Sequence, residues 1–160
     1  MILRATPLRI ALKGWLEVQV IKEPHLAQLE LTSTDWKKLK YLIVLLRPFA
    51  DFTHLLGSTR DPTINHTWNV YNTVFEHLEQ LQVKLSKKDK AINPWIDEFG
   101  PAIDAGVNKL SEYYSATGGQ VESQYALAAI LDPSQKLEIF NTPEWGRTFR
   151  NKYQQEFINY

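Results

Sequence analysis

Three carboxylates in the second half of the chain have the spacing that most closely suggests metal binding or acid–base catalysis. Asp97 and Asp104 are seven residues apart, so both would lie on one side of a helix, and Glu98 follows the first of them. No further ligand stands three or four residues away, and nothing in the surrounding sequence indicates that these carboxylates lose their water. We therefore interpret them as surface charges and expect no catalytic and no metal-binding residue in this chain.

The histidines offer no better constellation. The chain has four histidines, His25, His54, His66 and His77. Their spacing matches neither H-E-x-x-H nor another zinc motif. His66 and the row of Asn65, Asn69 and Asn72 could form a polar binding face, but a solvated helix face is the interpretation that we favour. The sequence also lacks G-x-S-x-G, G-x-G-x-x-G and Walker-type loops, so we expect no cofactor and no small-molecule substrate.

Two groups of basic residues are candidates for contacts with nucleic-acid phosphates. They are Lys37, Lys38 and Lys40 in the first half of the chain, and Arg147, Arg150 and Lys152 near its end. Each pattern is also what an amphipathic helix shows to water. Because 18 basic residues balance 18 acidic ones, the whole chain has no net positive charge to attract DNA. Any DNA binding should therefore be weak, largely independent of base sequence and strongly dependent on salt.

The tryptophans are numerous for a chain of this length. Trp36, Trp68 and Trp145 lie on apolar stripes, which favours packing in the core. An exposed tryptophan would instead be able to stack on a base. The pattern does not select which of the five that would be.

Composition limits the remaining classes of protein. A chain of 160 residues with 44% hydrophobic residues suits one domain spanning residues 1–160. The absence of cysteine excludes disulfides and thiol chemistry. The apolar run from Tyr41 to Leu46 is far shorter than the roughly 20 residues of a membrane helix, and Arg4, Arg9 and Lys13 interrupt the first apolar stretch. We expect no membrane partner.

Helix-start signals recur along the whole chain, and the helices that they predict should position the candidate residues described above. A capping residue followed by proline, or a capping box, begins each of five predicted helices, at Thr6-Pro7, Thr32 to Asp35, Asp61-Pro62, Asn93-Pro94 and Thr142-Pro143. Expected breaks are Glu23-Pro24, Gly57 and the loop 116–120. No strand-like alternation competes, so we predict an all-α fold, an irregular array of six or seven helices of which some bend at prolines such as Pro48 and Pro101.

Apolar residues at steps of three and four mark the buried faces of these helices. The first stripe consists of Leu8, Leu12, Trp15 and Val18. The second consists of Trp36, Leu39, Ile43, Leu46 and Phe49. The clearest stripe consists of Ile64, Trp68, Tyr71, Phe75, Leu78, Leu81 and Leu85. The later ones are Ile96, Phe99, Ile103, Val107, Leu110 and Tyr114, and then Trp145, Phe149, Tyr153 and Phe157.

The segment YALAAILDPSQKLEIF, residues 125–140, breaks an apolar helix at Asp132-Pro133 and resumes at once. A helix from about residue 122 to 131 should end before the proline. The Asp132 carboxylate can then accept hydrogen bonds from the free amides of a new short helix, whose first turn suits Pro133. Leu137 and Phe140 would return that helix to the core.

Taken in order, these segments resemble the hAT superfamily of DNA transposases from about residue 30 to the end of the chain. The matching residues are Leu31, Thr32, Trp36, Leu46, Pro48, Phe49, Ser58, Pro62, Thr63, Ile64, Ile130, Leu131, Asp132, Pro133, Lys136 and Leu137. The closing PEWGRTFRNKYQQEF is similar to the helix that follows this motif in fungal-type members. Ser134 stands where the family usually has arginine, so any contact of that arginine is absent here.

The resemblance implies that this chain is the helical insertion region of an RNase H-like catalytic domain. In the family, two aspartates lie before this region and a glutamate after it, where they would hold two metal ions. We expect a non-catalytic, nuclear transposase fragment without the BED zinc finger and the dimerisation segment, which contributes contacts to DNA or to other transposase segments. The alternative is a stand-alone helical protein-interaction module derived from a transposon. Asp132 would have a structural role.

Overall fold

The computed structural model describes residues 2–58, 60–116, 118, 120–141 and 146–160, and this part of the chain is all-α, as predicted, without a strand. The elements are α1 (Ile2–Ala5), α2 (Arg9–Lys22), η1 (Pro24–Leu29), α3 (Ser33–Leu56), η2 (Ile64–His66), α4 (Thr67–Ser86), α5 (Ile96–Ala116), α6 (Gln120–Leu131), η3 (Lys136–Phe140) and α7 (Gly146–Ile158), where η marks a 3-10 helix. None of the described helices is long and apolar enough to cross a membrane.

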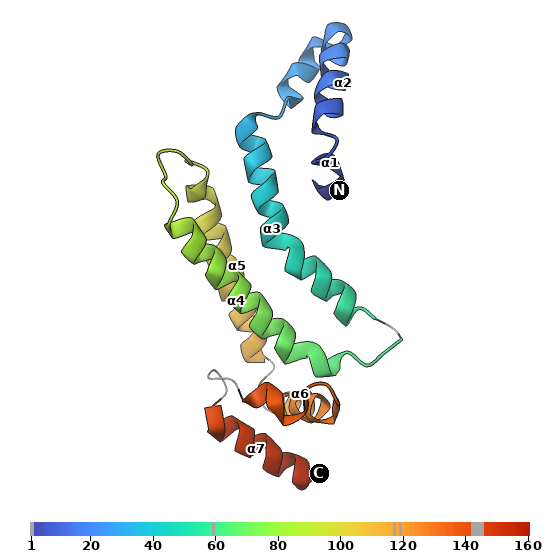
Figure 1. Ribbon diagram of the computed structural model, residues 1–160, viewed down its shortest axis with the longest axis vertical. Helices are drawn as coiled ribbons and strands as arrows, with labels where there is room; N and C mark the ends of the chain where they lie inside the picture. Colours follow the sequence, from blue (N-terminus) through green and yellow to red (C-terminus); the bar gives the residue numbers. More distant parts are fainter. Residues whose placement is uncertain (1, 59, 117, 119, 142–145) are drawn as a thin grey trace.

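Three long helices form the middle of the molecule. Figure 1 shows α3 running down, α4 returning upward and α5 running down again, with α6 and α7 below them. Their shared core, which we call the bundle core, consists of Leu45, Val74, Leu78, Leu81, Leu85, Trp95, Ile96, Phe99 and Ile103. The stripes predicted for α4 and α5 supply most of it, because both helices bury one apolar face against a neighbour.

A second, aromatic core lies where α6, η3 and α7 meet the first turn of α4. It consists of Trp68, Ala126, Phe140 and Tyr153. The Trp68 ring lies 5.5 Å from that of Phe140 and 5.2 Å from that of Tyr153, measured between centroids, which is the distance range of favourable ring contacts. This aromatic core therefore anchors the predicted return of residues 137 and 140 to the interior.

The N-terminal hairpin, formed by α2 and η1, is packed differently. In Figure 1 it lies at the upper end of the molecule, beyond the long helices, and α2 packs mainly against η1. No residue of α2 is buried, and the predicted stripe of Leu8, Leu12, Trp15 and Val18 is exposed. The helix ends before Pro24 as expected, but it begins at Arg9 after Leu8, so the predicted start at Thr6-Pro7 was wrong.

The start and end of α3 agree with the sequence. Thr32 accepts a hydrogen bond from the Asp35 amide at 3.1 Å, the Thr32 amide donates to the Asp35 carboxylate at 2.8 Å, and Gly57 follows the last turn. The helix continues past Pro48 to Leu56, so this proline does not end it.

The predicted face of α3 is correct only in its first part. Trp36 is buried, but Leu46 and Phe49 remain 49% and 37% exposed, while Leu45 and Phe52 pack on the bundle core. The apolar run of α3 is broad enough to offer two overlapping stripes, and contact with α4 and α5 selects the one that includes Leu45.

Three other boundaries differ from the predictions. Asp61-Pro62 leads into η2, and α4 begins only at Thr67, which leaves Ile64 exposed. Asn93-Pro94 lies in a turn before α5, which begins at Ile96. The helix expected from residue 122 starts at Gln120, inside the predicted loop. The predicted start at Thr142-Pro143 and the stripe residue Trp145 lie outside the described residues.

Candidate functional site

The three carboxylates with catalytic spacing do not converge. Asp97 pairs with Lys90 at 2.6 Å and Glu98 with Lys38 at 2.7 Å, whereas Asp104 accepts a hydrogen bond from the Gln82 amide at 2.6 Å. Each carboxylate therefore has its own partner on the surface. Among the residues that the structure describes, no group of three or more histidine, aspartate or glutamate side chains is placed to hold a metal ion.

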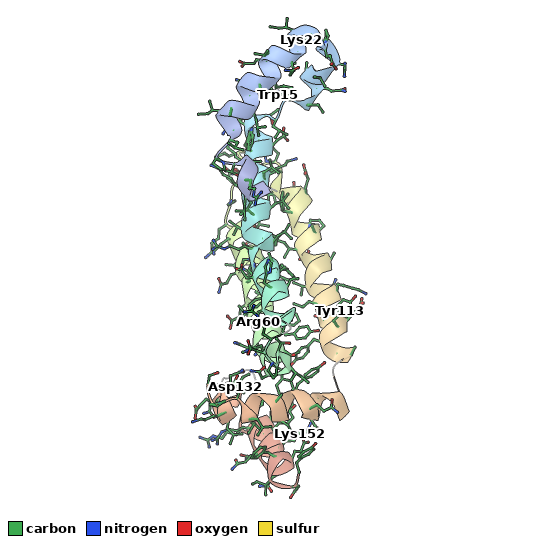
Figure 2. The ribbon with its side chains drawn as sticks, turned by 90° about the vertical axis from the view of Figure 1, so that its right-hand side faces the viewer. Trp15, Lys22, Arg60, Tyr113, Asp132 and Lys152 are labelled. Atoms are coloured by element: carbon green, nitrogen blue, oxygen red, sulfur yellow. The ribbon has the colours of Figure 1, made fainter. Side chains whose placement is uncertain are left out.

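The best-connected polar site is built around Asp132, in the turn between α6 and η3. One carboxylate oxygen accepts hydrogen bonds from the Ser134 amide at 2.8 Å and its hydroxyl at 2.7 Å. The other accepts from the side-chain amides of Asn65 at 2.6 Å and Gln135 at 2.7 Å. Figure 2 labels Asp132 where α6 lies against the long helices. We call this arrangement the Asp132 clasp, because it joins two segments, at Asn65 and at Asp132, that lie 67 residues apart in the chain.

The clasp corrects the interpretation of His66 and Asn65 as part of a solvated helix face. Both residues belong to η2, before α4 begins, and both are partly buried. The Gln135 amide nitrogen lies 3.4 Å from Nδ1 of His66, and the Asn65 amide nitrogen 3.4 Å from Nε2 of that ring. Of the other two asparagines, Asn69 is exposed, as that interpretation expects, and Asn72 is partly buried.

Hydrogen bonds to the charged form lower the pKa of Asp132 well below the ordinary range of an aspartate. The Ser134 hydroxyl and amide have the largest effect, followed by the side chains of Gln135 and Asn65. A carboxylate held in this way is a poor proton acceptor near neutral pH. The arrangement therefore suits a structural role.

The family-motif segment, with Asp132, Pro133, Lys136 and Leu137, is a tight corner. Asp132 does accept a free backbone amide, as predicted, but η3 begins only at Lys136, without a side-chain cap. The Lys136 amide donates to the Asp132 carbonyl at 2.9 Å, and Lys136 has a positive φ of 52°, which the sequence did not indicate. Leu137 packs against the aromatic core.

The first basic group lies at the start of α3. Lys38 is engaged with Glu98, but Lys37 and Lys40 line a pocket of about 310 Å³ between α3 and the connection from α4 to α5. Lys88, on that connection, joins them, and sequence reasoning missed it because it lies some 50 residues further along the chain. We call this the lysine pocket; Tyr41, Val44, Asn93 and Trp95 complete its wall.

The second basic group, on α7, is less available. The Lys152 ammonium lies 3.4 Å from the Glu122 carboxylate and 5.0 Å from the ring centroid of Tyr153. Arg150 is partly buried, and Arg147 is exposed. Figure 1 places the start of α3 and α7 toward opposite ends of the long axis, so the two predicted basic groups do not form one surface.

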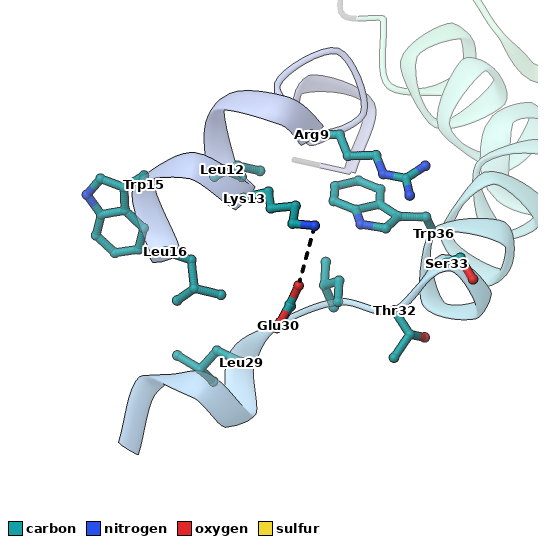
Figure 3. A pocket seen from close by; sticks show the side chains of 11 residues that line it. Arg9, Leu12, Lys13, Trp15, Leu16, Leu29, Glu30, Thr32, Ser33 and Trp36 are labelled. Carbon is teal, nitrogen blue, oxygen red and sulfur yellow. Dashed lines mark ion pairs between the residues drawn. The ribbon is translucent and has the colours of Figure 1, made fainter. Parts of the chain in front are cut away.

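A larger cleft, of about 410 Å³, opens between α2, η1 and the start of α3 (Figure 3). Leu12, Leu16 and Leu29 contribute to an apolar wall, and the Arg9 guanidinium lies 5.4 Å from the ring centroid of Trp36. Its one carboxylate, Glu30, lies 4.0 Å from the Lys13 ammonium, so the lining offers no pair of acid and base.

The structure shows which tryptophans are buried and which is exposed, a difference that the sequence pattern did not indicate. Trp36, Trp68 and Trp95 are buried, and Trp15, beside the cleft, is 58% exposed. Core packing of Trp36 and Trp68 is therefore confirmed. Trp15 is the exposed tryptophan among those that the structure describes.

Comparison with known proteins gives one informative similarity. Over 132 residues, or 82% of its length, the chain is 33% identical to "Putative transcriptional regulator tpeD" of the fungus Talaromyces stipitatus. The matched segment spans only 13% of that protein, so the chain corresponds to a small part of this curated relative. No family model matches the chain. No solved structure matches it.

Proposed function

We propose that this chain is a non-catalytic helical region of a hAT-like, transposase-derived protein, and that it contributes contacts to DNA or to neighbouring protein segments in the nucleus. The proposal rests on the ordered resemblance of the sequence and on the all-α fold. The Talaromyces relative carries the name of a putative transcriptional regulator, and this supports the nuclear setting.

The observation that carries the proposal is the Asp132 clasp. Two of the segments that carry the resemblance are the one around Pro62 to Ile64 and the one around Ile130 to Asp132. The hydrogen bond from Asn65 to Asp132 joins the two, and the strongest packing of α6 is against η2. Asp132 belongs to one of these segments and Asn65 directly follows the other, so two parts of the resemblance meet at one site.

The clasp also supports a role for this chain outside the chemical step. DNA strand transfer needs carboxylates that converge on metal ions. Here Asp132 accepts hydrogen bonds from three side chains and one backbone amide, and the carboxylates of α5 each face a separate partner. We infer that the catalytic work of such a protein is done by other residues than these.

One observation favours the second candidate, a stand-alone helical protein-interaction module. The N-terminal hairpin exposes apolar side chains around a cleft, and exposed apolar surface of this kind often marks a contact with another protein. This module would need no affinity for DNA.

The purified chain should be tested against a labelled duplex with inverted-repeat ends, in magnesium and in manganese, and by a salt titration of binding. We expect no cleavage and weak binding that fades steeply with salt. Metal-dependent cleavage that disappears in Asp132→Asn would assign chemistry to Asp132 and overturn the proposal. Absence of DNA binding by the folded chain would favour the interaction module, and tight binding to one base sequence at high salt would reveal a specific reading surface.

A further inference from the structure

The lysine pocket offers hydrogen-bond donors and cations without a carboxylate among its lining residues. Lys37 and Lys40 reach it from α3, and Lys88 reaches it from the connection between α4 and α5. All three side chains are exposed. A concave site that brings together ammonium groups from two separate segments favours an anion over any other ligand.

Lys88 is held in place by the aromatic floor of the pocket. Its ammonium nitrogen lies 5.2 Å from the ring centroid of Tyr41 and 4.9 Å from that of Trp95, both within the range of cation–π attraction. A lysine that is already positioned loses less side-chain entropy when it binds a ligand. Lys88 is therefore better prepared to meet an anion than an isolated surface lysine.

Two donors beneath Lys88 have no partner. The Tyr41 hydroxyl oxygen and the Trp95 indole nitrogen are buried and make no hydrogen bond within the described part of the chain. Burial also raises the pKa of the Tyr41 hydroxyl above its ordinary value, so that it stays protonated and able to donate. Unpaired buried donors call for an explanation, and both belong to residues that line this pocket.

The local charge balance differs from that of the whole chain. Of the neighbouring lysines, Lys38 is neutralised by Glu98 and Lys90 by Asp97. In the described residues, no carboxylate forms an ion pair with Lys37, Lys40 or Lys88. A chain with zero net charge therefore carries a local excess of positive charge at this pocket.

We propose that the lysine pocket binds a phosphate group of the DNA backbone, with Lys37, Lys40 and Lys88 as its contacts. The ligand group is a phosphate and not a base, because Trp95 is only 5% exposed and the Lys88 ammonium lies over its ring, which leaves no free face for stacking. Binding through this pocket is consequently independent of base sequence. The inference rests on the DNA-contacting role proposed above and assigns that role to one site.

The test compares the unmodified chain with a pocket variant, Lys37→Gln/Lys40→Gln/Lys88→Gln, for binding to a short mixed-sequence DNA duplex over a range of salt. The matched control is Arg4→Gln/Lys22→Gln/Arg60→Gln, which removes the same charge from exposed residues elsewhere. We expect the pocket variant to bind about tenfold more weakly at low salt. The slope of the logarithm of its affinity against the logarithm of the salt concentration should fall by about one unit for each lysine removed. The affinity and the slope of the control should stay close to those of the unmodified chain.

Two further measurements make the result decisive. The double variant Lys37→Gln/Lys40→Gln leaves the ring contacts of Lys88 intact and should lose most of the same affinity, which separates binding from any effect on folding. The indole N–H signal of Trp95 in an NMR titration should shift when the duplex is added. Equal losses in the pocket and control variants, or an unmoved Trp95 signal, would overturn the pocket while leaving DNA binding in place. Absence of binding by the unmodified chain would overturn both.

Discussion

The N-terminal hairpin and the aromatic core show that the apolar content of a helix does not by itself decide its burial. Helix α2 is rich in apolar residues and buries none of them, whereas the much more polar α7 buries Tyr153 completely. The difference lies in the neighbours. Tyr153 meets side chains from three other elements, and α2 meets mainly η1. Contact with other elements, and not apolar content alone, decides what a helix contributes to the stability of the fold.

The largest effect that this comparison predicts is for Trp68→Ala. This residue is buried at the centre of the aromatic core, so its removal should lower the free energy of unfolding by about 3–5 kcal/mol. Urea unfolding followed by circular dichroism measures the change. A loss comparable to that of an exposed residue would mean that the aromatic core contributes little to the stability of the molecule.

Tyr153→Phe should have the next largest effect. The Tyr153 hydroxyl donates to the Glu122 carboxylate, and loss of a hydrogen bond to a charged group lowers the free energy of unfolding by about 1.5–3 kcal/mol. Tyr160→Phe is the matched control, because Tyr160 is almost fully exposed. Similar unfolding midpoints for the two variants would show that the hydrogen bond to Glu122 adds no net stability.

Tyr153 also predicts a loss of stability at alkaline pH. Burial, and then the hydrogen bond to Glu122, raise the pKa of Tyr153 far above its ordinary value. Below a pH of about 10 the hydroxyl is protonated in both the folded and the unfolded chain; above it only the unfolded chain ionises, so stability falls. The difference in melting temperature between the unmodified chain and Tyr153→Phe should therefore shrink as the pH rises past this value.

The Asp132 clasp predicts a smaller effect, at acid pH. Because the folded pKa of Asp132 lies below its unfolded value of about 3.9, its stabilisation is complete above that pH and is lost as the pH falls. Melting temperatures between neutral and acid pH should fall more for the unmodified chain than for Asp132→Asn. Asp61→Asn, at an exposed position, should follow the unmodified chain; parallel curves for all three would contradict the clasp.

The smallest effect is expected for Trp15→Ala, the counterpart of Trp68→Ala. The side chain is largely exposed on α2, so the free energy of unfolding should change by no more than about 0.5 kcal/mol. The same urea titration measures it. A loss as large as that of the buried tryptophan would mean that the hairpin is covered in solution and would remove the contrast between the two regions.

Local chemistry was predictable from the sequence, and long-range contact was not. The capping box of Thr32 and Asp35 and the apolar stripe of α4 depend on residues within one or two turns, and both were predicted. The exposure of Leu46 was not, because α3 offers two apolar stripes and only its neighbours select one.

The candidate site followed the same division. Lys37 and Lys40 were identified as candidates from their own pattern, but Lys88 meets them only through the return of the chain along α4. The contact between Asp132 and Asn65 was equally unpredictable, because the two residues lie far apart in the sequence and no local pattern connects them. The left-handed backbone of Lys136 occurs at a residue whose type gives no warning of it.

Helix α4 belongs to both cores: Trp68 in its first turn lies in the aromatic core, and Val74, Leu78, Leu81 and Leu85 lie in the bundle core. This sharing has a consequence for cooperativity. Neither core opens fully without disturbing a helix on which the other depends, so the amides in the middle of α4 should exchange with deuterium only when the whole unit unfolds. The amides of α2, which has no buried residue, should exchange through local opening and much earlier. The protein is therefore expected to behave as one large cooperative unit with a small, independently fluctuating extension.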